Sequence, residues 1–153
     1  MKQQDYNATI TVGATAHEAF EHISHVWEWW TENFEGSAHD PGDIFTVRFG
    51  ETFVTCKITE AVPDRKIVWL VTDCYLGWLA DKKEWQDTKI DWEITGANIL
   101  TEVSMTHIGL VPAVECYDSC VKGWNEYVKD SLFKLITSGK GQPQRKAQQA
   151  ETN

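Results

Sequence analysis

Four side chains in this sequence have types and spacings that could bind a metal ion. Cys116 and Cys120 lie four residues apart in the stretch ECYDSCVKGW, and His22 and His25 lie three residues apart nearer the N-terminus. On helices, the two members of each pair would lie on one face. Thiolate and imidazole are the usual ligands of zinc, which takes four of them in a tetrahedron. The two pairs together could therefore complete a zinc site.

The cysteine pair also has a simpler interpretation. Trp124 and Val121 share the helical face with Cys120, and cysteine in apolar surroundings is more often a small buried hydrophobe than a ligand. A disulfide between Cys116 and Cys120 is unfavourable on a helix, because side chains one turn apart run roughly parallel. A reducing compartment also keeps thiols free. We therefore expect free thiols, no bound metal and no cofactor.

His107 is the acid–base candidate of the chain. In the stretch MTHIGL, strand alternation places it on one face with Val103 and Met105. An imidazole that points into an apolar cavity could carry a proton in catalysis. The alternative is a core histidine whose nitrogens bond to a backbone carbonyl or a tyrosine. No serine-nucleophile, zinc-protease or phosphate-loop motif accompanies His107.

Length and charge restrict the classes of partner. The chain has 153 residues and a formal net charge of -9, which fits one domain and disfavours binding to phosphate backbones or anionic lipids. It contains neither the apolar run of a signal peptide nor the ~18 apolar residues of a membrane span. We expect a cytoplasmic protein that neither binds nucleic acid nor inserts into a membrane. The 8 tryptophans suggest a large, flat apolar surface.

Hydrophobic periodicity predicts an α+β chain. Thr15 and Glu18 fit a capping box at the start of a helix, and a second short helix is expected at residues 26–30. Pro112 opens the longest helical pattern, which runs to about Leu135. The expected strands are residues 6–12, 44–50, 52–62, 67–73, 88–95 and 99–110.

The expected domain covers residues 1–138. The remainder, residues 139–153, has no large apolar side chain and is expected to be disordered. The short gaps between strands indicate an antiparallel sheet, whose apolar face the long C-terminal helix must cover. A curved sheet seldom closes flush on a helix, so we expect a cavity between them. The loop at 74–87 is interpreted as a lid, a portal or a dimer contact, or else as an apolar cluster over the sheet edge.

Several segments resemble one branch of the START-related (SRPBCC) superfamily, which also contains the birch-pollen allergen. The branch is named after the activator of the heat-shock-protein-ninety ATPase, and the resemblance spans residues 6–143. The segments that carry it are AHEAFEHI, WEWWTENFEG, KITEAVPDRKIVWLVTDC, MTHIGL and ECYDSCVKGWNEYVKDSLFKLITSGKGQP. The resemblance implies a helix-grip fold, in which a curved antiparallel sheet wraps around a long C-terminal helix and two short helices follow the first strand.

The resemblance also implies a function. Such scaffolds hold small hydrophobic molecules between sheet and helix, so we expect a binding module for an aromatic or acyl ligand rather than an enzyme. Two alternatives stay open: a cyclase or hydrolase that uses His107, and a chaperone- or stress-related interaction module. A homodimer is also left open. Gly123 is expected to allow a close approach of neighbouring groups. The residues predicted to bind the ligand are Trp30, Phe49, Cys56, Trp69, Trp92, Met105, His107, Tyr117, Cys120 and Trp124.

Overall fold

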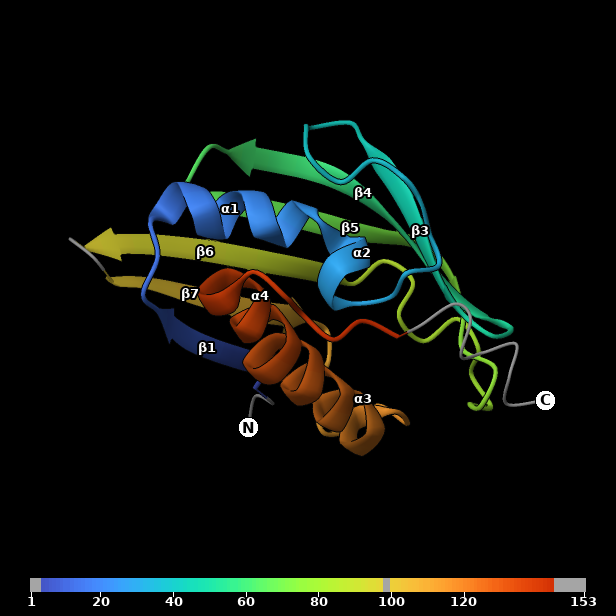
Figure 1. The fold of residues 1–153 in the computed structure, drawn as a ribbon. Helices are drawn as coiled ribbons and strands as arrows, with labels where there is room; N and C mark the ends of the chain where they lie inside the picture. The colour runs from blue at the N-terminus through green and yellow to red at the C-terminus, as the bar shows by residue number, and fades with distance from the viewer. Residues whose placement is uncertain (1–3, 98–99, 145–153) are drawn as a thin grey trace.

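An antiparallel sheet with helices packed on one face forms the described part of the chain, residues 4–97 and 100–144 of a computed structural model (Figure 1). Within these ranges there are seven strands: β1 (Tyr6–Val12), β2 (Phe34–Gly36), β3 (Ile44–Phe49), β4 (Thr52–Val62), β5 (Lys66–Tyr75), β6 (Lys89–Ala97) and β7 (Leu100–Ile108). They are ordered β1-β7-β6-β5-β4-β3-β2, and each neighbouring pair is antiparallel. The predicted antiparallel sheet is confirmed, and β2 is a short strand that the sequence pattern missed.

The helices belong to an N-terminal pair and a long C-terminal helix. Their bounds are α1 (Ala16–Ser24), α2 (Val26–Trp29), α3 (Tyr117–Trp124), η1 (Asn125–Leu132) and α4 (Phe133–Ser138). The last three follow one another without a break and form the long helix that lies against the sheet on the same side as α1 (Figure 1). The predicted helix-grip fold is therefore confirmed. No helix in the described ranges has the length and apolar composition that a membrane span requires.

The start of α1 follows the predicted capping box. The Thr15 hydroxyl accepts a 3.0 Å hydrogen bond from the Glu18 backbone N–H, and the Glu18 carboxylate accepts a 2.9 Å bond from the Thr15 backbone N–H. Both bonds satisfy backbone donors that a helix start leaves open. The start of the C-terminal helix was predicted wrongly, because it begins at Tyr117 and not at Pro112.

The middle of the C-terminal helix is wider than the sequence predicted. Residues Asn125–Leu132 form a π-helix, η1, where an uninterrupted α-helix was expected. Ser131, which is buried in η1, donates a 2.7 Å hydrogen bond to the Trp29 carbonyl and accepts one of 2.7 Å from the Gln142 backbone N–H. These contacts tie η1 to α2 and to the segment that follows α4. π-helical turns are frequent at functional sites.

The segment after the last helix is ordered further than expected. Residues 139–144, which the sequence pattern assigned to a disordered tail, run back along α2. The Gln144 backbone N–H donates a 2.9 Å hydrogen bond to the Trp30 carbonyl, and the Glu32 backbone N–H donates one of 2.9 Å to the Gln144 carbonyl. Paired backbone groups hold this segment although it lacks apolar side chains. The rest of the predicted tail, residues 145–153, lies outside the described residues.

The concave face of the sheet is filled with aromatic side chains. Ile90, Trp92 and Ile94 are buried on one face of β6, as their alternation predicted. The Trp92 ring lies edge-on to Trp29 and Trp69, with ring centroids 5.6 and 5.4 Å away. This cluster accounts for much of the unusual tryptophan content.

Candidate functional site

A pocket opens where the C-terminal helix leaves the sheet. Its volume is about 320 Å³, near the lower end of the ~300–1,000 Å³ range of small-molecule sites. The walls come from α2, β3, β4, the loop after β5, and the helices α3 and η1. Its lining is Trp30, Phe49, Thr52, Val54, Leu76, Trp78, Trp85, Ser119, Cys120, Gly123, Trp124 and Tyr127. Most of these side chains are apolar, so the pocket suits an apolar molecule.

Three indole rings form the deep wall of the pocket. Trp124 projects from α3 and stacks on Trp85 from the loop, with ring centroids 5.7 Å apart and planes 10° from parallel. On its other side Trp124 contacts Trp30, whose ring centroid is 5.0 Å away. Trp30 in turn lies 6.2 Å from Trp69 in the filled part of the core, with planes 6° from parallel. The wall is therefore rigid and offers flat apolar surface.

A buried histidine fixes the orientation of Trp124. The Trp124 indole N–H donates a 3.0 Å hydrogen bond to Nδ1 of His107, which is 0% exposed. The Thr88 hydroxyl donates a 2.6 Å bond to the Trp85 carbonyl and lies 2.9 Å from His107 Nε2. Because Nδ1 accepts this hydrogen bond, Nε2 of the neutral ring carries the proton and donates a hydrogen bond to the Thr88 hydroxyl oxygen. Burial lowers the pKa of His107 to about 3, so the ring stays neutral at ordinary pH.

His107 therefore behaves as the core histidine that the sequence offered as the alternative. Both ring nitrogens are engaged, although by Trp124 and Thr88 instead of the expected carbonyl or tyrosine. His107 lies behind the Trp124 ring and is not part of the pocket lining among the described residues. The geometry gives it a positioning role and leaves no nitrogen free to exchange a proton with a ligand.

The polar groups of the lining are few. Thr52 already accepts a 3.1 Å hydrogen bond from the Gly77 backbone N–H. Tyr127 lies one turn after Trp124 and packs near Phe49, with ring centroids 6.2 Å apart. Its hydroxyl has no hydrogen-bond partner within residues 4–97 and 100–144, and burial raises its pKa. Tyr127 can therefore offer a ligand one hydrogen bond within an apolar wall.

The loop after β5 closes one side of the pocket and is held by two carboxylates. Glu115 accepts hydrogen bonds from the backbone N–H groups of Ala80 (3.0 Å) and Asp81 (3.2 Å), and these bonds lower its pKa. In the opposite direction, the carboxylate of Glu84 in the loop accepts hydrogen bonds of 2.8 and 2.9 Å from the backbone N–H groups of Glu115 and Cys116. The loop and the start of α3 are thus clasped to each other. Glu84 also places a negative charge at the positive end of α3.

The same loop has a buried part and an exposed part. Leu76, Leu79 and Trp85 belong to the core, as expected for an apolar cluster over the sheet edge. Trp78 is 55% exposed and lies on the rim of the pocket. The loop therefore forms the apolar cluster that its sequence offered as one alternative, while a role as lid, portal or dimer contact stays a prediction.

The cysteines differ from the sequence expectation. Cys116 and Cys120 form a disulfide, with Cα atoms 5.6 Å apart, where free thiols were predicted. The prediction was wrong because it placed both residues inside a helix. Cys116 is the N-cap residue of α3, so it lies at the start of the helix and not within it. His22 and His25 lie on and beside α1 and are grouped with Glu28, so the two pairs do not combine into the four-ligand zinc site that was weighed as an alternative.

The pocket contains part of the predicted set of ligand-binding residues. Trp30, Phe49, Cys120 and Trp124 line it, and their binding role stays a prediction. The other members lie elsewhere. Tyr117 is half-buried outside the lining, and the sheet residues are fully buried in the core behind it: Cys56, Trp69, Trp92, Met105 and His107. Alternation identified the concave face correctly, but it could not tell that aromatic rings fill most of that face.

Gly123 lies in the pocket wall for a reason that the sequence did not show. A Cβ atom built on it would meet no atom within 4 Å, so the predicted close approach of a neighbour is wrong. The missing side chain instead leaves room in the pocket. Sequence analysis also missed Tyr127, although its three-residue spacing from Trp124 was a usable signal. Leu76, Trp78 and Trp85 could be placed only once the fold of the loop after β5 was known.

Comparisons with known proteins identify relatives of this chain. The family model described as "Activator of Hsp90 ATPase homolog 1-like protein" matches residues 15–137. A search of curated proteins found no match. Among solved structures, the Aha1 dimer from Colwellia psychrerythraea superposes with a TM-score of 0.73 at 21% identity, over 90% of this chain and 98% of the other.

Two further structures share the fold. DynU16, from the dynemicin biosynthetic locus, gives a TM-score of 0.65 at 17% identity, over 92% of this chain and 49% of its own. A protein from Staphylococcus saprophyticus gives 0.67 at 15% identity, with coverage of 90% and 95%. At these identities the likeness shows a common fold.

Proposed function

The chain belongs to the Activator of Hsp90 ATPase homolog 1-like family, and on that premise we propose that it is a binding protein for a small, flat, apolar molecule. The ligand enters the pocket between the C-terminal helix and the sheet. This fold commonly serves as a scaffold for ligand binding, while its members differ in what they bind. The proposal therefore rests on the pocket of this chain and not on the family name.

The observation that carries the proposal is the wall of stacked indoles. Trp85 and Trp124 lie with planes 10° from parallel, and Trp30 closes the deep end. Aromatic pairs in offset or edge-on contact gain about 0.5–1.5 kcal/mol beyond burial alone. A flat aromatic ligand uses such a wall better than a flexible acyl chain, which also loses more conformational entropy on binding. The volume of about 320 Å³ fits a ligand of two or three fused rings.

The polar groups of the pocket support binding rather than catalysis. Within the described residues, the lining contains no carboxylate, imidazole or amine. General acid–base catalysis requires a titratable group within hydrogen-bond reach of the reacting atom. The Tyr127 hydroxyl is the best placed group to orient a ligand, for example through a phenolic hydroxyl or a carbonyl. An aromatic ligand with one such group is therefore favoured.

A titration with 2-naphthol tests the proposal. We expect saturable, one-to-one binding to the wild-type chain, followed by calorimetry and tryptophan emission. Gly123→Leu should abolish it, because the new side chain fills the pocket without a backbone clash. Lys122→Leu, one residue away and exposed, serves as the matched control and should bind normally. Equal binding by the Gly123 and Lys122 variants would place the ligand elsewhere and contradict the proposal.

Self-association is a second candidate function, favoured by the exposure of Trp78. This side chain is 55% exposed at the pocket rim, although large apolar groups usually avoid water. The similar structure from Colwellia psychrerythraea is described as a dimer. Light scattering of the wild type and of Trp78→Ser tests this candidate. A concentration-dependent dimer that the substitution weakens would support it, and a monomer at all concentrations would exclude it.

A further inference from the structure

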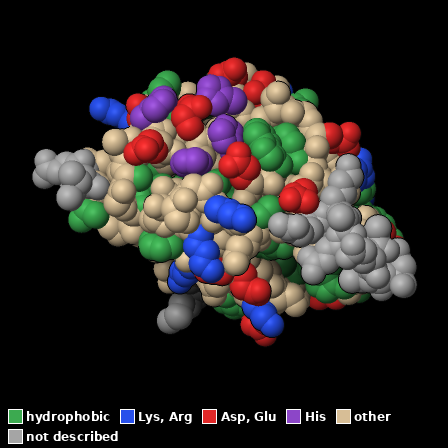
Figure 2. All heavy atoms as spheres, in the orientation of Figure 1, with side chains coloured by type: hydrophobic (Ala, Val, Ile, Leu, Met, Phe, Trp, Pro, Cys, Tyr) green, Lys and Arg blue, Asp and Glu red, His purple; other side chains and the backbone are tan. Residues whose placement is uncertain are grey.

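Histidines gather on the face of the molecule that carries α1, away from the pocket wall formed by α3. Figure 2 shows them in purple, interspersed with acidic side chains in red. Four of the five histidines of the chain belong to this region by sequence, at positions 17, 22, 25 and 39. Their partners differ, and the difference sets His22 apart from the other three.

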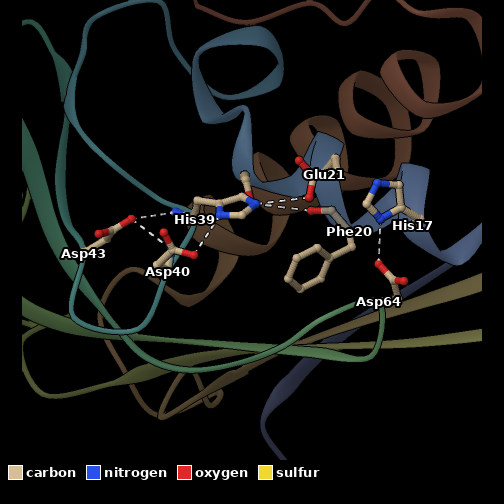
Figure 3. A network of polar contacts seen from close by, with 8 residues as sticks. His17, Phe20, Glu21, His39, Asp40, Asp43 and Asp64 are labelled. Atoms are coloured by element: carbon tan, nitrogen blue, oxygen red, sulfur yellow. Dashed lines mark hydrogen bonds and ion pairs between the residues drawn. The ribbon is translucent and has the colours of Figure 1, made fainter.

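His17 and His39 are each paired with carboxylates (Figure 3). His17 Nδ1 lies 2.9 Å from the Asp64 carboxylate. His39 lies between two acids, with Nδ1 2.9 Å from Asp40 and Nε2 3.1 Å from Glu21. These hydrogen bonds raise the pKa of both imidazoles. Ordinary ion pairs therefore account for this pair of histidines.

His22 has a ring nitrogen without such a partner. Its Nδ1 is buried and has no hydrogen-bond partner within residues 4–97 and 100–144. A buried polar atom without a partner costs about 1–3 kcal/mol of folding free energy, so it calls for an explanation. A metal ion is one group that satisfies an unprotonated imidazole nitrogen. The residues around His22 supply the other ligands that such an ion requires.

The turn between α1 and α2 brings two more ligands close to His22. His25 ends α1 with φ of -84° and ψ of 61°, and this bend directs α2 so that Glu28 approaches the histidines. His25 Nδ1 lies 3.4 Å from a Glu28 carboxylate oxygen. One ligand atom from each of His22, His25 and Glu28 lies within 4.8 Å of the other two.

We propose that His22, His25 and Glu28 form a binding site for a divalent transition-metal ion of the zinc type. Two imidazoles and one carboxylate are a known set for zinc, with the fourth position open to water or another ligand. The same donors suit nickel, copper and cobalt ions, while magnesium and calcium prefer oxygen ligands alone. This site is independent of the proposed ligand pocket.

The geometry requires only a small adjustment to hold the ion. Zinc–ligand distances of ~2.0–2.1 Å place tetrahedral donors about 3.4 Å apart. In the structure, the three ligand atoms lie within 4.8 Å of one another. The His25 and Glu28 side chains are 39% and 38% exposed, so both can rotate toward His22 without disturbing the core. The bound ion would connect the last turn of α1 to α2, which ends beside Trp30.

The inference replaces the sequence expectation of no metal, which concerned a different set of ligands. That expectation weighed His22 and His25 together with Cys116 and Cys120. The structure pairs the two cysteines with each other and supplies Glu28 as the third ligand instead. The spacing of His22 and His25 is the part of that sequence signal that the proposal keeps, with Glu28 in place of the two cysteines.

Metal titration of the full chain without an affinity tag tests the site. Zinc should bind at one equivalent by calorimetry, and cobalt should give the visible absorption of a low-symmetry, four-coordinate ion. His22→Ala and Glu28→Gln should each weaken zinc binding by roughly 10–100-fold or more. Replacing a residue that only supports a metal ligand already costs this much affinity, so removal of a ligand should cost no less. His17→Ala is the matched control, because His17 lies on the same helix and is paired with Asp64. Circular dichroism establishes that each variant is folded.

Two outcomes would overturn the proposal. One is wild-type protein that binds no zinc at micromolar concentration. The other is an equal loss of affinity in His17→Ala and in His22→Ala, which would indicate diffuse binding to the histidine-rich surface.

Discussion

The indole N–H of Trp124 donates a 3.0 Å hydrogen bond to Nδ1 of His107. This bond joins the wall of the pocket to β7 of the sheet. On its other side, the His107 ring is hydrogen-bonded to the Thr88 hydroxyl, which donates a hydrogen bond to the Trp85 carbonyl. The same hydrogen-bond network therefore holds both stacked indoles. A residue that resembles a catalytic group in the sequence therefore positions a wall of the pocket.

The first prediction concerns this support. His107→Leu removes the acceptor of the buried Trp124 N–H and should lower the free energy of unfolding by about 1–3 kcal/mol. Urea unfolding measures the change. Ile108→Phe is the control, since Ile108 is the next residue on β7 and is 40% exposed. An unchanged stability in His107→Leu would mean that the hydrogen bond contributes nothing.

The pH dependence of stability follows from the same burial. The pKa of His107 is about 3 in the folded chain, against 6.5 for the free side chain. Between these values the unfolded chain binds a proton that the folded chain does not, so stability falls as the pH is lowered, by up to about 1.4 kcal/mol per pH unit. Urea unfolding from pH 7 to pH 4 should show a shallower dependence in His107→Leu. Equal slopes would contradict a buried neutral ring.

Gly123 gives a prediction in which stability and binding change in opposite directions. Gly123→Ala should raise the free energy of unfolding by up to about 1 kcal/mol, because alanine is the better helix former and its methyl group meets no atom within 4 Å. The same methyl group takes space from the pocket and should weaken 2-naphthol binding. Urea unfolding and calorimetry measure the two effects. Destabilisation by alanine would show that the site is already filled.

The clasp between the loop and α3 should depend on the charge of Glu115. Backbone hydrogen bonds from Ala80 and Asp81 lower the pKa of Glu115 below its usual 4.5. The clasp is therefore complete above pH 4.5 and is lost as the pH falls through the lower, folded-state value. Glu115→Gln should speed amide hydrogen exchange at Ala80 and Asp81 at neutral pH. Glu126→Gln, on the exposed side of η1, should not, and protection unaffected by Glu115→Gln would refute the role of its charge.

The sequence predicted features that depend on local pattern. Strand alternation placed Ile90, Trp92 and His107 on the buried face, and the spacing of Thr15 and Glu18 located the start of α1. These predictions succeed because side-chain direction in a strand and capping at a helix start are set by residues near in sequence. The family resemblance supplied the order of the elements and therefore the fold.

Features that depend on distant contacts were not predictable in the same way. Cys116 lies at the start of α3 and not within a helix. There its backbone N–H donates a hydrogen bond to the carboxylate of Glu84, which is far away in sequence. The ordered segment ending at Gln144 is held largely by backbone hydrogen bonds to Trp30 and Glu32, which follow α2. Trp92 fell outside the pocket because neighbouring indoles fill the space in front of it. Such outcomes depend on packing, which periodicity does not encode.

The most direct test of the ligand pocket uses the indole N–H signals of the tryptophans, of which the chain has 8. During titration with 2-naphthol, nitrogen–proton correlation spectra of the labelled protein should show saturable shifts for the four tryptophans of the lining: Trp30, Trp78, Trp85 and Trp124. Trp27, which is 40% exposed and lies outside this lining, should not move. Absence of any saturable shift, or a shift confined to Trp27, would contradict the claim that this pocket is the binding site.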